Sequence, residues 1–104
     1  MDINSVSETE IVQSIGQRFK SYRLHLNKTQ QDIANQIGIS VLTISNFENG
    51  KNTDISFKNI LKMLRAINEL EPIQYILPEI PISPKMVVKM QGKSKQRSTK
   101  KRTL

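Results

Sequence analysis

Apolar residues recur at spacings of four and three early in the chain, at Ile11, Ile15, Phe19, Tyr22 and Leu26. This spacing places them on one face of a helix and predicts that this face is buried. The helix begins at a capping box formed by Ser7 and Glu10, with Val6 and Ile11 as the hydrophobic staple around it. A glycine inside a helix, here Gly16, costs ~1 kcal/mol relative to alanine. Either a neighbouring helix approaches closely at this position or the glycine is merely tolerated.

The following stretch, residues 29–50, predicts two short helices joined by a tight turn. Thr29 caps the first helix by accepting the amide hydrogen of Asp32. The turn comes at Gly38, because a residue without Cβ adopts a left-handed backbone conformation at little cost. Ser40 caps the second helix, and an Asn-Gly pair ends it. The inward residues of the two helices are Ile33, Ala34, Ile37, Ile44 and Phe47. The outward face of the second helix carries small side chains with few charges, which suits a helix that lies close against another surface.

Further along, Ser56 is the expected cap of a fourth helix, and Pro72 suits the first turn of a short fifth helix over residues 73–77. The apolar residues predicted to face inward from the fourth helix are Phe57, Ile60, Leu61, Met63, Leu64 and Ile67. Its outward residues are Lys58, Lys62 and Arg65. In the short fifth helix, Tyr75, Ile76 and Leu77 are expected to be either core residues or contacts of a dimer.

Beyond residue 77 the pattern changes. Prolines at 78, 81 and 84 predict an extended segment without regular hydrogen bonding. A short sixth helix is predicted over 84–91, and because so short a helix is marginal alone, its apolar residues Met86, Val87 and Met90 must dock on something. Residues 93–104 lack apolar side chains until the last and are expected to form a flexible, disordered tail.

The charge of the chain is unevenly distributed. Its formal net charge is +7, and its hydrophobic content of 37 % is typical of a small helical domain with a less ordered segment. All eight Lys and Arg residues that follow position 84 lie in a stretch without Asp or Glu, so residues 1–84 are close to neutral. Such a basic tail either contacts nucleic acid, where it releases counterions from phosphates, or simply keeps a terminus solvated.

Several classes of function are poorly supported. The chain has no Cys and one His, so neither a disulfide framework nor a Cys- or His-based metal site is expected. His25 is the only His, so no catalytic Ser-His pair can be assembled beyond that one residue, and it is expected to be a solvated surface residue. The scattered carboxylates form no convincing acid–base pair. We therefore expect no enzyme activity and no cofactor. The amino end resembles no signal peptide and no apolar stretch reaches membrane-spanning length, so a cytoplasmic protein is expected.

Several residues within the stretch 29–50 have a characteristic spacing. Thr29-Gln30 opens a helix, Gly38 occupies the turn, and Thr43-Ile44-Ser45 lies in the next helix, with Glu48 and Gly50 after it. This spacing resembles the helix-turn-helix of the Cro/C1-type (XRE) repressors. The resemblance implies an all-α, five-helix, lambda-repressor-like DNA-binding domain over residues 7–77, followed by an extension over 78–104. In such a motif the second helix enters the major groove of DNA. An αα-hairpin in an unrelated helical protein remains the alternative, although it gives no reason for the small, polar outward face.

The resemblance also implies which residues contact DNA. Gln30 corresponds to a residue that bonds a phosphate and braces the recognition helix. The expected DNA-binding residues are Gln30, Ser40, Val41, Leu42, Thr43, Ser45, Asn46, Asn49, Lys51 and Asn52. Where many family members carry Gln, Arg or Lys, this chain offers Val41 and Leu42, which suit thymine methyl groups. We therefore expect A·T-leaning half-sites. Because one domain reads too few base pairs for useful specificity, we also expect a homodimer that binds palindromic sites.

Arg23 and Glu48 match a family pair that ties the first helix to the end of the recognition helix. A planar guanidinium that meets a carboxylate through two hydrogen bonds suits a partly buried tie of this kind. The alternative is that both side chains are exposed, in which case the pair contributes ~0–1 kcal/mol.

A narrower similarity lies within the family. T-I-S-N-F-E-N-G and the segment after it look like HipB-type antitoxins, and the region from Ile80 to Arg97 is similar to the tails of regulators encoded beside HipA-like kinases. This implies a repressor that autoregulates a HipBA-like toxin–antitoxin operon and contacts the kinase toxin through Met86, Val87 and Met90 or the tail. The alternatives are a stand-alone or phage-type repressor without a toxin partner, and an RNA-binding helical protein that uses the basic tail.

Overall fold

The computed structural model describes residues 2–81, and within that range the chain is helical and contains no strand. The elements in chain order are the 3-10 helix η1 (Ile3–Ser5), the α-helices α1 (Glu8–His25), α2 (Gln30–Ile37), α3 (Val41–Glu48) and α4 (Phe57–Ala66), and the 3-10 helix η2 (Glu71–Tyr75). The chain divides into two units between Gln74 and Tyr75, so the four α-helices belong to the first unit. Among the helices described, none is long and apolar enough to cross a membrane.

Local sequence signals define both ends of α1. Ser7 caps the helix by accepting the amide hydrogen of Glu10, and the Glu10 side chain accepts the Ser7 amide in return, which confirms the predicted capping box. At the other end Asn27 adopts a left-handed conformation with φ 57°. The Lys28 amide then donates to the Arg23 carbonyl, as in a Schellman motif. The helix therefore stops in time for the chain to turn into α2 within a few residues.

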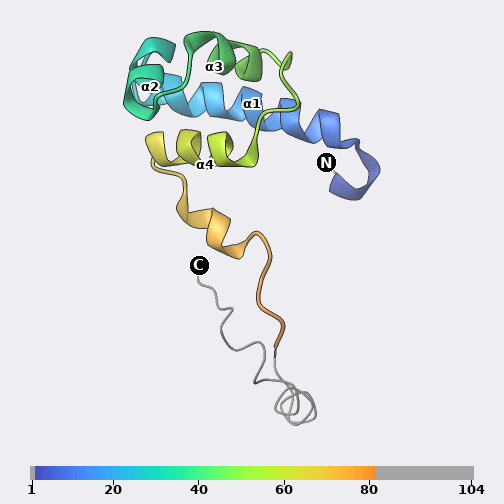
Figure 1. Cartoon of the computed structure of the whole chain (residues 1–104). Helices are drawn as coiled ribbons and strands as arrows, with labels where there is room; N and C mark the ends of the chain where they lie inside the picture. Colours follow the sequence, from blue (N-terminus) through green and yellow to red (C-terminus); the bar gives the residue numbers. More distant parts are fainter. Residues whose placement is uncertain (1, 82–104) are drawn as a thin grey trace. The chain divides into compact units, whose positions relative to one another are not determined.

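The four α-helices enclose a single core. Its buried apolar residues are Phe19, Ile33, Ala34, Ile44, Phe47, Met63, Ala66 and Ile67. The rings of Phe19 and Phe47 lie 6.0 Å apart at an interplanar angle of 52°, which joins α1 to α3. In Figure 1, α1 runs between α3 and α4, and α2 crosses one end of the three. Burial of each large side chain in this core contributes on the order of 1.5–3 kcal/mol.

α1 and α3 approach each other closely at Gly16. A Cβ added to Gly16 would overlap the carbonyl oxygen of Phe47 and lie 3.0 Å from its carbonyl carbon. The two alternatives offered by the sequence are thus resolved in favour of a close helix approach, since no side chain fits at this position. The contact sets the distance between α1 and the C-terminal half of α3.

The prediction that Tyr22 and Phe57 are buried is wrong. Tyr22 is exposed, because the buried face of α1 is rotated toward Gly16, Phe19 and Arg23. Phe57 is 53 % exposed, since it is the first residue of α4, and the deeply buried positions of that helix are Met63 and Ala66, in its last turns. The predicted cap at Ser56 is confirmed.

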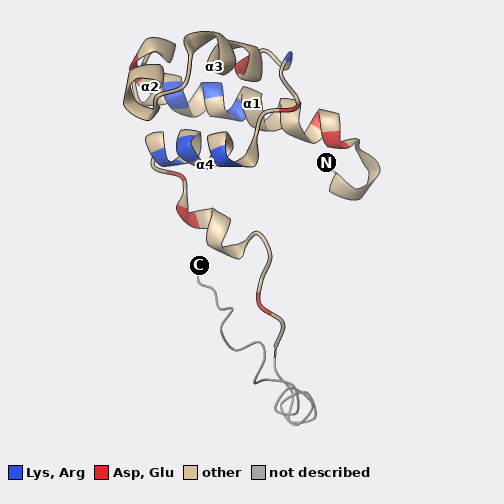
Figure 2. Cartoon of the chain, in the orientation of Figure 1, with Lys and Arg blue, Asp and Glu red and all other residues tan. Residues whose placement is uncertain are grey.

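The basic residues predicted on the outside of α4 are exposed. Lys58, Lys62 and Arg65 recur at spacings of four and three and form one charged stripe along the helix (Figure 2). Just beyond the end of this helix, Asn68 has φ 63° and repeats the left-handed conformation that follows α1. Both helix ends use asparagine where glycine is the commoner choice.

The chain after α4 departs from the predicted fifth helix. In place of an α-helix over 73–77, the structure has the 3-10 helix η2, which begins at Glu71 and ends at Tyr75. The following residues Ile76 and Leu77 are exposed, as is Tyr75, so the alternative that places them in the core is wrong for the part of the chain described here. Residues 78–81 contain no helix or strand. The predicted sixth helix at 84–91, with Met86, Val87 and Met90, and the basic tail 93–104 lie outside the described residues.

Candidate nucleic-acid interface

The connection from α2 to α3 begins with a tightly capped helix. Thr29 Oγ1 accepts the amide hydrogen of Asp32 at 2.9 Å, and Asp32 Oδ2 accepts the amide hydrogen of Thr29 at 2.8 Å. The hydrogen bond from the Thr29 backbone to this carboxylate, followed by the interaction with the Thr29 hydroxyl, lowers the pKa of the Asp32 carboxyl below its ordinary value. The carboxylate also lies at the positive end of the helix dipole. The start of α2 is therefore fixed by its own sequence.

The turn between α2 and α3 depends on glycine for its backbone conformation. Gly38 has φ 72° and donates its amide hydrogen to the Ala34 carbonyl, which ends α2. A Cβ at Gly38 would meet nothing within 4 Å, so the requirement is conformational and not steric. Ser40 then caps α3 by accepting the amide hydrogen of Thr43 at 3.1 Å. The short turn sends Ile44 of α3 into the core and leaves the opposite side of the helix to solvent.

A buried ion pair fixes the end of α3 against α1. Arg23 Nε donates to Glu48 Oε2 at 2.7 Å, and Arg23 Nη2 donates to Glu48 Oε1 at 2.9 Å. The exposed fractions of the two side chains are 7 % and 0 %, so the alternative of an exposed pair does not describe them. The hydrogen bonds to the carboxylate raise the pKa of the Arg23 guanidinium. This bidentate geometry is the strong, directional form of an arginine–carboxylate pair.

Further hydrogen bonds extend the ion pair to the other helices. Arg23 Nη1 donates to the Lys28 carbonyl at 2.8 Å, and Gln30 Nε2 donates to Glu48 Oε1 at 3.0 Å. Lys28 Nζ in turn donates to the Ala66 carbonyl at 2.9 Å, where its charge complements the negative end of the α4 dipole. All four α-helices are thus joined through one polar network. The Glu48 side chain is fully buried in this network.

The outward face of α3 is small and nearly uncharged. Leu42 is its most exposed residue at 69 %, Ser45 and Asn46 are half-buried, and Asn49 is exposed at the helix end. Val41 was expected on the outward face, but it is half-buried and packs against the core. The hydroxyls of Ser40 and Thr43 lie 2.9 Å apart and are hydrogen-bonded to each other. Leu42 is therefore the large apolar side chain that α3 presents.

The loop after α3 is held in place at several points. The amide hydrogens of Lys51 and Asn52 both donate to the Asn46 carbonyl, at 2.8 and 3.0 Å. Gly50 adopts φ 77°, and its carbonyl accepts a hydrogen bond from Gln13 Nε2 at 3.1 Å. The side chain of Lys51 is exposed. Asn49, Lys51 and Asn52 are thereby fixed beside the end of α3, next to its outward face.

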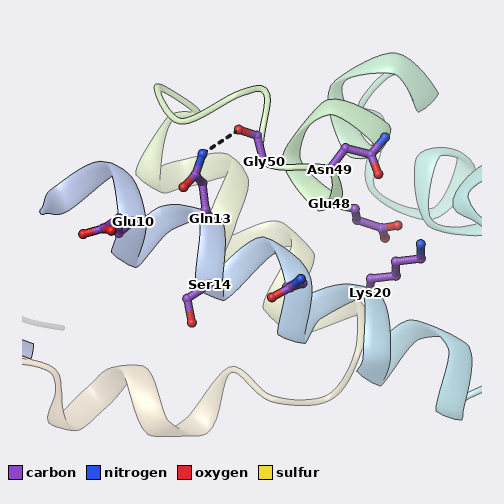
Figure 3. Close-up of a pocket in the computed structure, with 8 residues that line it drawn as sticks. Glu10, Gln13, Ser14, Lys20, Glu48, Asn49 and Gly50 are labelled. Atoms are coloured by element: carbon purple, nitrogen blue, oxygen red, sulfur yellow. Dashed lines mark hydrogen bonds between the residues drawn. The ribbon is translucent and has the colours of Figure 1, made fainter. Parts of the chain in front are cut away.

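A polar hollow of about 570 Å³ opens where α1 passes the end of α3. Five residues of α1 and three residues around the end of α3 line it. Figure 3 shows the Lys20 side chain extending from α1 toward Glu48 and Asn49, and the hydrogen bond from Gln13 to Gly50 at the other side of the hollow. A separate hollow of about 350 Å³ between α1, α4 and η2 is mainly apolar.

A sequence model of the helix-turn-helix family of Cro/C1, or XRE, type matches residues 19–73, more than half of the chain. The chain belongs to this family. Its members are DNA-binding transcriptional regulators, and α2, the turn at Gly38 and α3 form the helix-turn-helix of this regulator. A search of curated proteins returned no match.

The helix-turn-helix regulator brings most of the DNA-binding residues expected from its sequence onto one side of α3 and the following loop. Gln30 lies at the start of α2 and contacts Glu48 instead of projecting freely. Val41 is the residue of this set that packs inward. Glu48 is bound to Arg23, as described above.

Three features of the regulator were not predicted from its sequence, and only the last of them had a signal there. The bond from Lys28 to Ala66 joins residues far apart in the chain, and no local signal identifies it. The bond from Gln13 to Gly50 is equally distant in sequence. Lys20 could have been found, because Gln13, Gln17 and Lys20 recur at spacings of four and three and form a polar stripe beside the buried face of α1.

Proposed function

We propose that this helix-turn-helix regulator is a dimeric repressor that reads specific double-stranded DNA sequences with α3 in the major groove. The observation that carries the proposal is the outward face of α3, which is small, nearly uncharged and held rigidly by the Arg23–Glu48 pair and the Ser40 cap. An α-helix with such a face fits a major groove about 12 Å wide. The proposed DNA contacts are Gln30, Ser40, Val41, Leu42, Thr43, Ser45, Asn46, Asn49, Lys51 and Asn52.

Within this set the roles differ. Leu42, at 69 % exposure, supplies the apolar contact to thymine methyl groups, and Val41 contributes less because part of its surface is packed inward. Ser40, Thr43 and Asn46 supply polar discrimination. The second Nε2 hydrogen of Gln30 and the exposed ammonium of Lys51 contact phosphates, which position the helix without reading sequence.

Selection of bound duplexes from a random pool tests the proposal. We expect enrichment of a palindromic site whose half-sites lean toward A·T. Half-sites dominated by guanine and cytosine would contradict the assignment of Leu42. Equal binding of all duplexes, together with comparable affinity for structured RNA, would instead favour an RNA-binding helical protein that uses the basic tail.

Dimerisation follows from the size of the site that one unit can read. A single α3 contacts too few base pairs for useful specificity, whereas a two-fold dimer places two recognition helices about 34 Å apart on successive turns of one face of DNA. The exposed apolar residues Tyr75, Ile76, Leu77 and Ile80 support the proposal, because a second copy would remove them from water. Sedimentation equilibrium tests it, and a protein that remains monomeric both free and on the selected duplex would contradict it.

The basic residues after position 84 supply a second, sequence-independent source of affinity. They have no acidic neighbours in that stretch, whereas the residues before them are close to neutral. Removal of residues 93–104 should weaken binding to all duplexes alike and reduce the salt dependence of affinity. An unchanged salt dependence would assign the tail to another partner.

The wider role that we propose is autoregulation of a HipBA-like toxin–antitoxin operon. The support is the similarity of T-I-S-N-F-E-N-G and the residues after it to HipB-type antitoxins, with Met86, Val87 and Met90 as contacts for a HipA-like kinase toxin. Co-expression with a HipA-like kinase encoded in the neighbouring gene should yield a stable complex. A gene neighbourhood without such a kinase would favour the alternative of a stand-alone or phage-type repressor.

A further inference from the structure

The polar hollow beside the end of α3 shares Glu48 with the buried network and Asn49 with the proposed DNA contacts, whereas the Lys20 side chain that lines it has no role assigned so far. Its walls are the side of α1 that carries Gln13, Gln17 and Lys20, and the end of α3 at Asn49 and Gly50. It encloses about 570 Å³ and is lined mainly by polar groups, which makes it unsuited to bury an apolar side chain. Its donors are the Lys20 ammonium and the side-chain amides of Gln17 and Asn49.

We propose that Lys20, together with the amides of Gln17 and Asn49, binds a phosphate of the DNA backbone that runs beside the recognition helix. The inference rests on the proposed function, since it requires α3 to lie in the major groove. It adds a contact from α1, which lies outside the helix-turn-helix itself. The ligand is a backbone phosphate of duplex DNA, so this contact contributes affinity and orientation but carries no sequence information.

The position of Asn49 places the hollow at the edge of the DNA-facing surface. Leu42, Ser45 and Asn49 follow one another at spacings of three and four, so they share the outward side of α3. Asn49 also lines the hollow. A helix with its side chains is about 10–12 Å across, nearly the width of the groove that receives it, so the phosphate rows lie directly against its flanks. The hollow occupies one of these flanks, at the C-terminal end of α3.

The charges around the hollow leave Lys20 as its effective cation. Glu48 lines the wall, but its carboxylate is compensated by Arg23 and also accepts a hydrogen bond from Gln30. Glu10 lies two turns or more from Lys20 along α1 and its carboxylate is engaged in the cap of that helix. Lys20 itself is exposed, and Figure 3 shows its side chain extending from α1 toward Glu48 at the end of α3. A phosphate that enters at this end meets positive charge.

The walls of the hollow are rigid without a ligand. Gly16 packs so closely against the Phe47 backbone that no Cβ fits between them, which holds α1 directly against α3. The bond from Gln13 to the Gly50 carbonyl holds the loop after α3 against α1. The donors lie on α1 and at the end of α3, which are packed against each other. Binding of a phosphate therefore requires ordering of the Lys20 side chain but no movement of the backbone.

The test compares Lys20→Gln with Lys62→Gln in the full-length protein. Each variant removes one positive charge and keeps a long polar side chain, and Lys62 lies on the outward side of α4, away from the hollow. Affinity for the selected duplex and for a scrambled duplex is measured by fluorescence anisotropy across a range of salt concentrations. For Lys20→Gln we expect the slope of log affinity against log salt to fall by about 0.9, which is about an eightfold change in affinity relative to the parent per tenfold change in salt.

The loss in Lys20→Gln should be equal for the selected and the scrambled duplex, and Lys62→Gln should retain the parent slope. A Lys20→Gln protein whose slope matches that of the parent would overturn the inference while leaving the proposed function intact. Equal reductions in both variants would also overturn it, because they would reflect net charge and not a contact. If the parent protein binds no duplex with sequence preference, the proposed function fails and the inference fails with it.

Discussion

The most informative perturbation of the fold is Glu48→Gln, which removes the charge but keeps the size of a fully buried side chain. The carboxylate accepts hydrogen bonds from Arg23 Nε and Nη2 and from Gln30 Nε2. A carboxamide has one oxygen, and its nitrogen cannot accept. At least one of these donors must therefore face another donor, and the Arg23 guanidinium loses its counter-charge in a buried position.

The magnitude follows from the burial of the pair. Removal of one partner of a buried ion pair costs on the order of 3–5 kcal/mol, because the remaining charge is stranded. A unit of this size is stable by roughly 4–12 kcal/mol, so the variant loses a large part of its stability. For a domain of this length each kcal/mol corresponds to about 4–8 °C, which gives a fall in melting temperature of roughly 12–40 °C. An exposed pair, at ~0–1 kcal/mol, would lower the melting temperature by at most about 8 °C.

Thermal and urea unfolding followed by circular dichroism measure the effect, with Glu79→Gln as the matched control. Glu79 is exposed, so its variant should melt with the parent protein. A double-mutant cycle that adds Arg23→Met should give a coupling free energy of about 1–3 kcal/mol, because each single change already breaks the same contact. A Glu48→Gln protein that melts within about 8 °C of the control, the most that an exposed pair of ~0–1 kcal/mol would cause, would refute the assignment of this pair as the tie between α1 and α3.

Three further outcomes are expected. Gly16→Ala should lower the free energy of unfolding by ~1–3 kcal/mol in urea titrations, although alanine favours helix, because its Cβ overlaps the Phe47 carbonyl; a gain in stability would contradict the close approach. Leu42→Ala should weaken specific DNA binding without changing the melting temperature, whereas Val41→Ala should lower the melting temperature as well, since only Val41 packs against the core. The stability contributed by Asp32 should be complete above its unfolded pKa of ~3.9 and lost as the pH falls through its lower folded pKa. The urea midpoint of Asp32→Asn should therefore change less between neutral and acidic pH than the midpoint of the parent protein does. A change equal to that of the parent would contradict the cap.

Features that depend on a few adjacent residues could be predicted from the sequence. The caps at Ser7, Thr29, Ser40 and Ser56 and the left-handed turn at Gly38 are of this kind, because the hydrogen bonds that define them are made within three or four residues. The helical spacing of apolar residues likewise located the four α-helices. These signals were sufficient to find the helix-turn-helix.

Features that depend on the rotation of a helix about its axis could not be predicted as well. Tyr22 and Phe57 fit the apolar spacing but are exposed, because Gly16 turns α1 toward α3 and the burial of α4 is greatest in its last turns. Val41 was expected to face DNA and is half-buried, since the first turn of α3 lies over the core. After α4, periodicity within a few residues could not distinguish a short α-helix over 73–77 from the 3-10 helix η2.

The central claim, that α3 reads DNA through Leu42, is tested most directly by a cycle between protein and DNA. In the selected duplex, thymine is replaced by uracil at each half-site position in turn, which deletes one methyl group and nothing else. Removal of a buried methyl contact costs about 0.8 kcal/mol, or about fourfold in affinity. We predict this loss at one or more positions for the parent protein and its absence at the same positions for Leu42→Ala. Equal sensitivity of both proteins at every position, or no sensitivity of the parent at any, would contradict the claim.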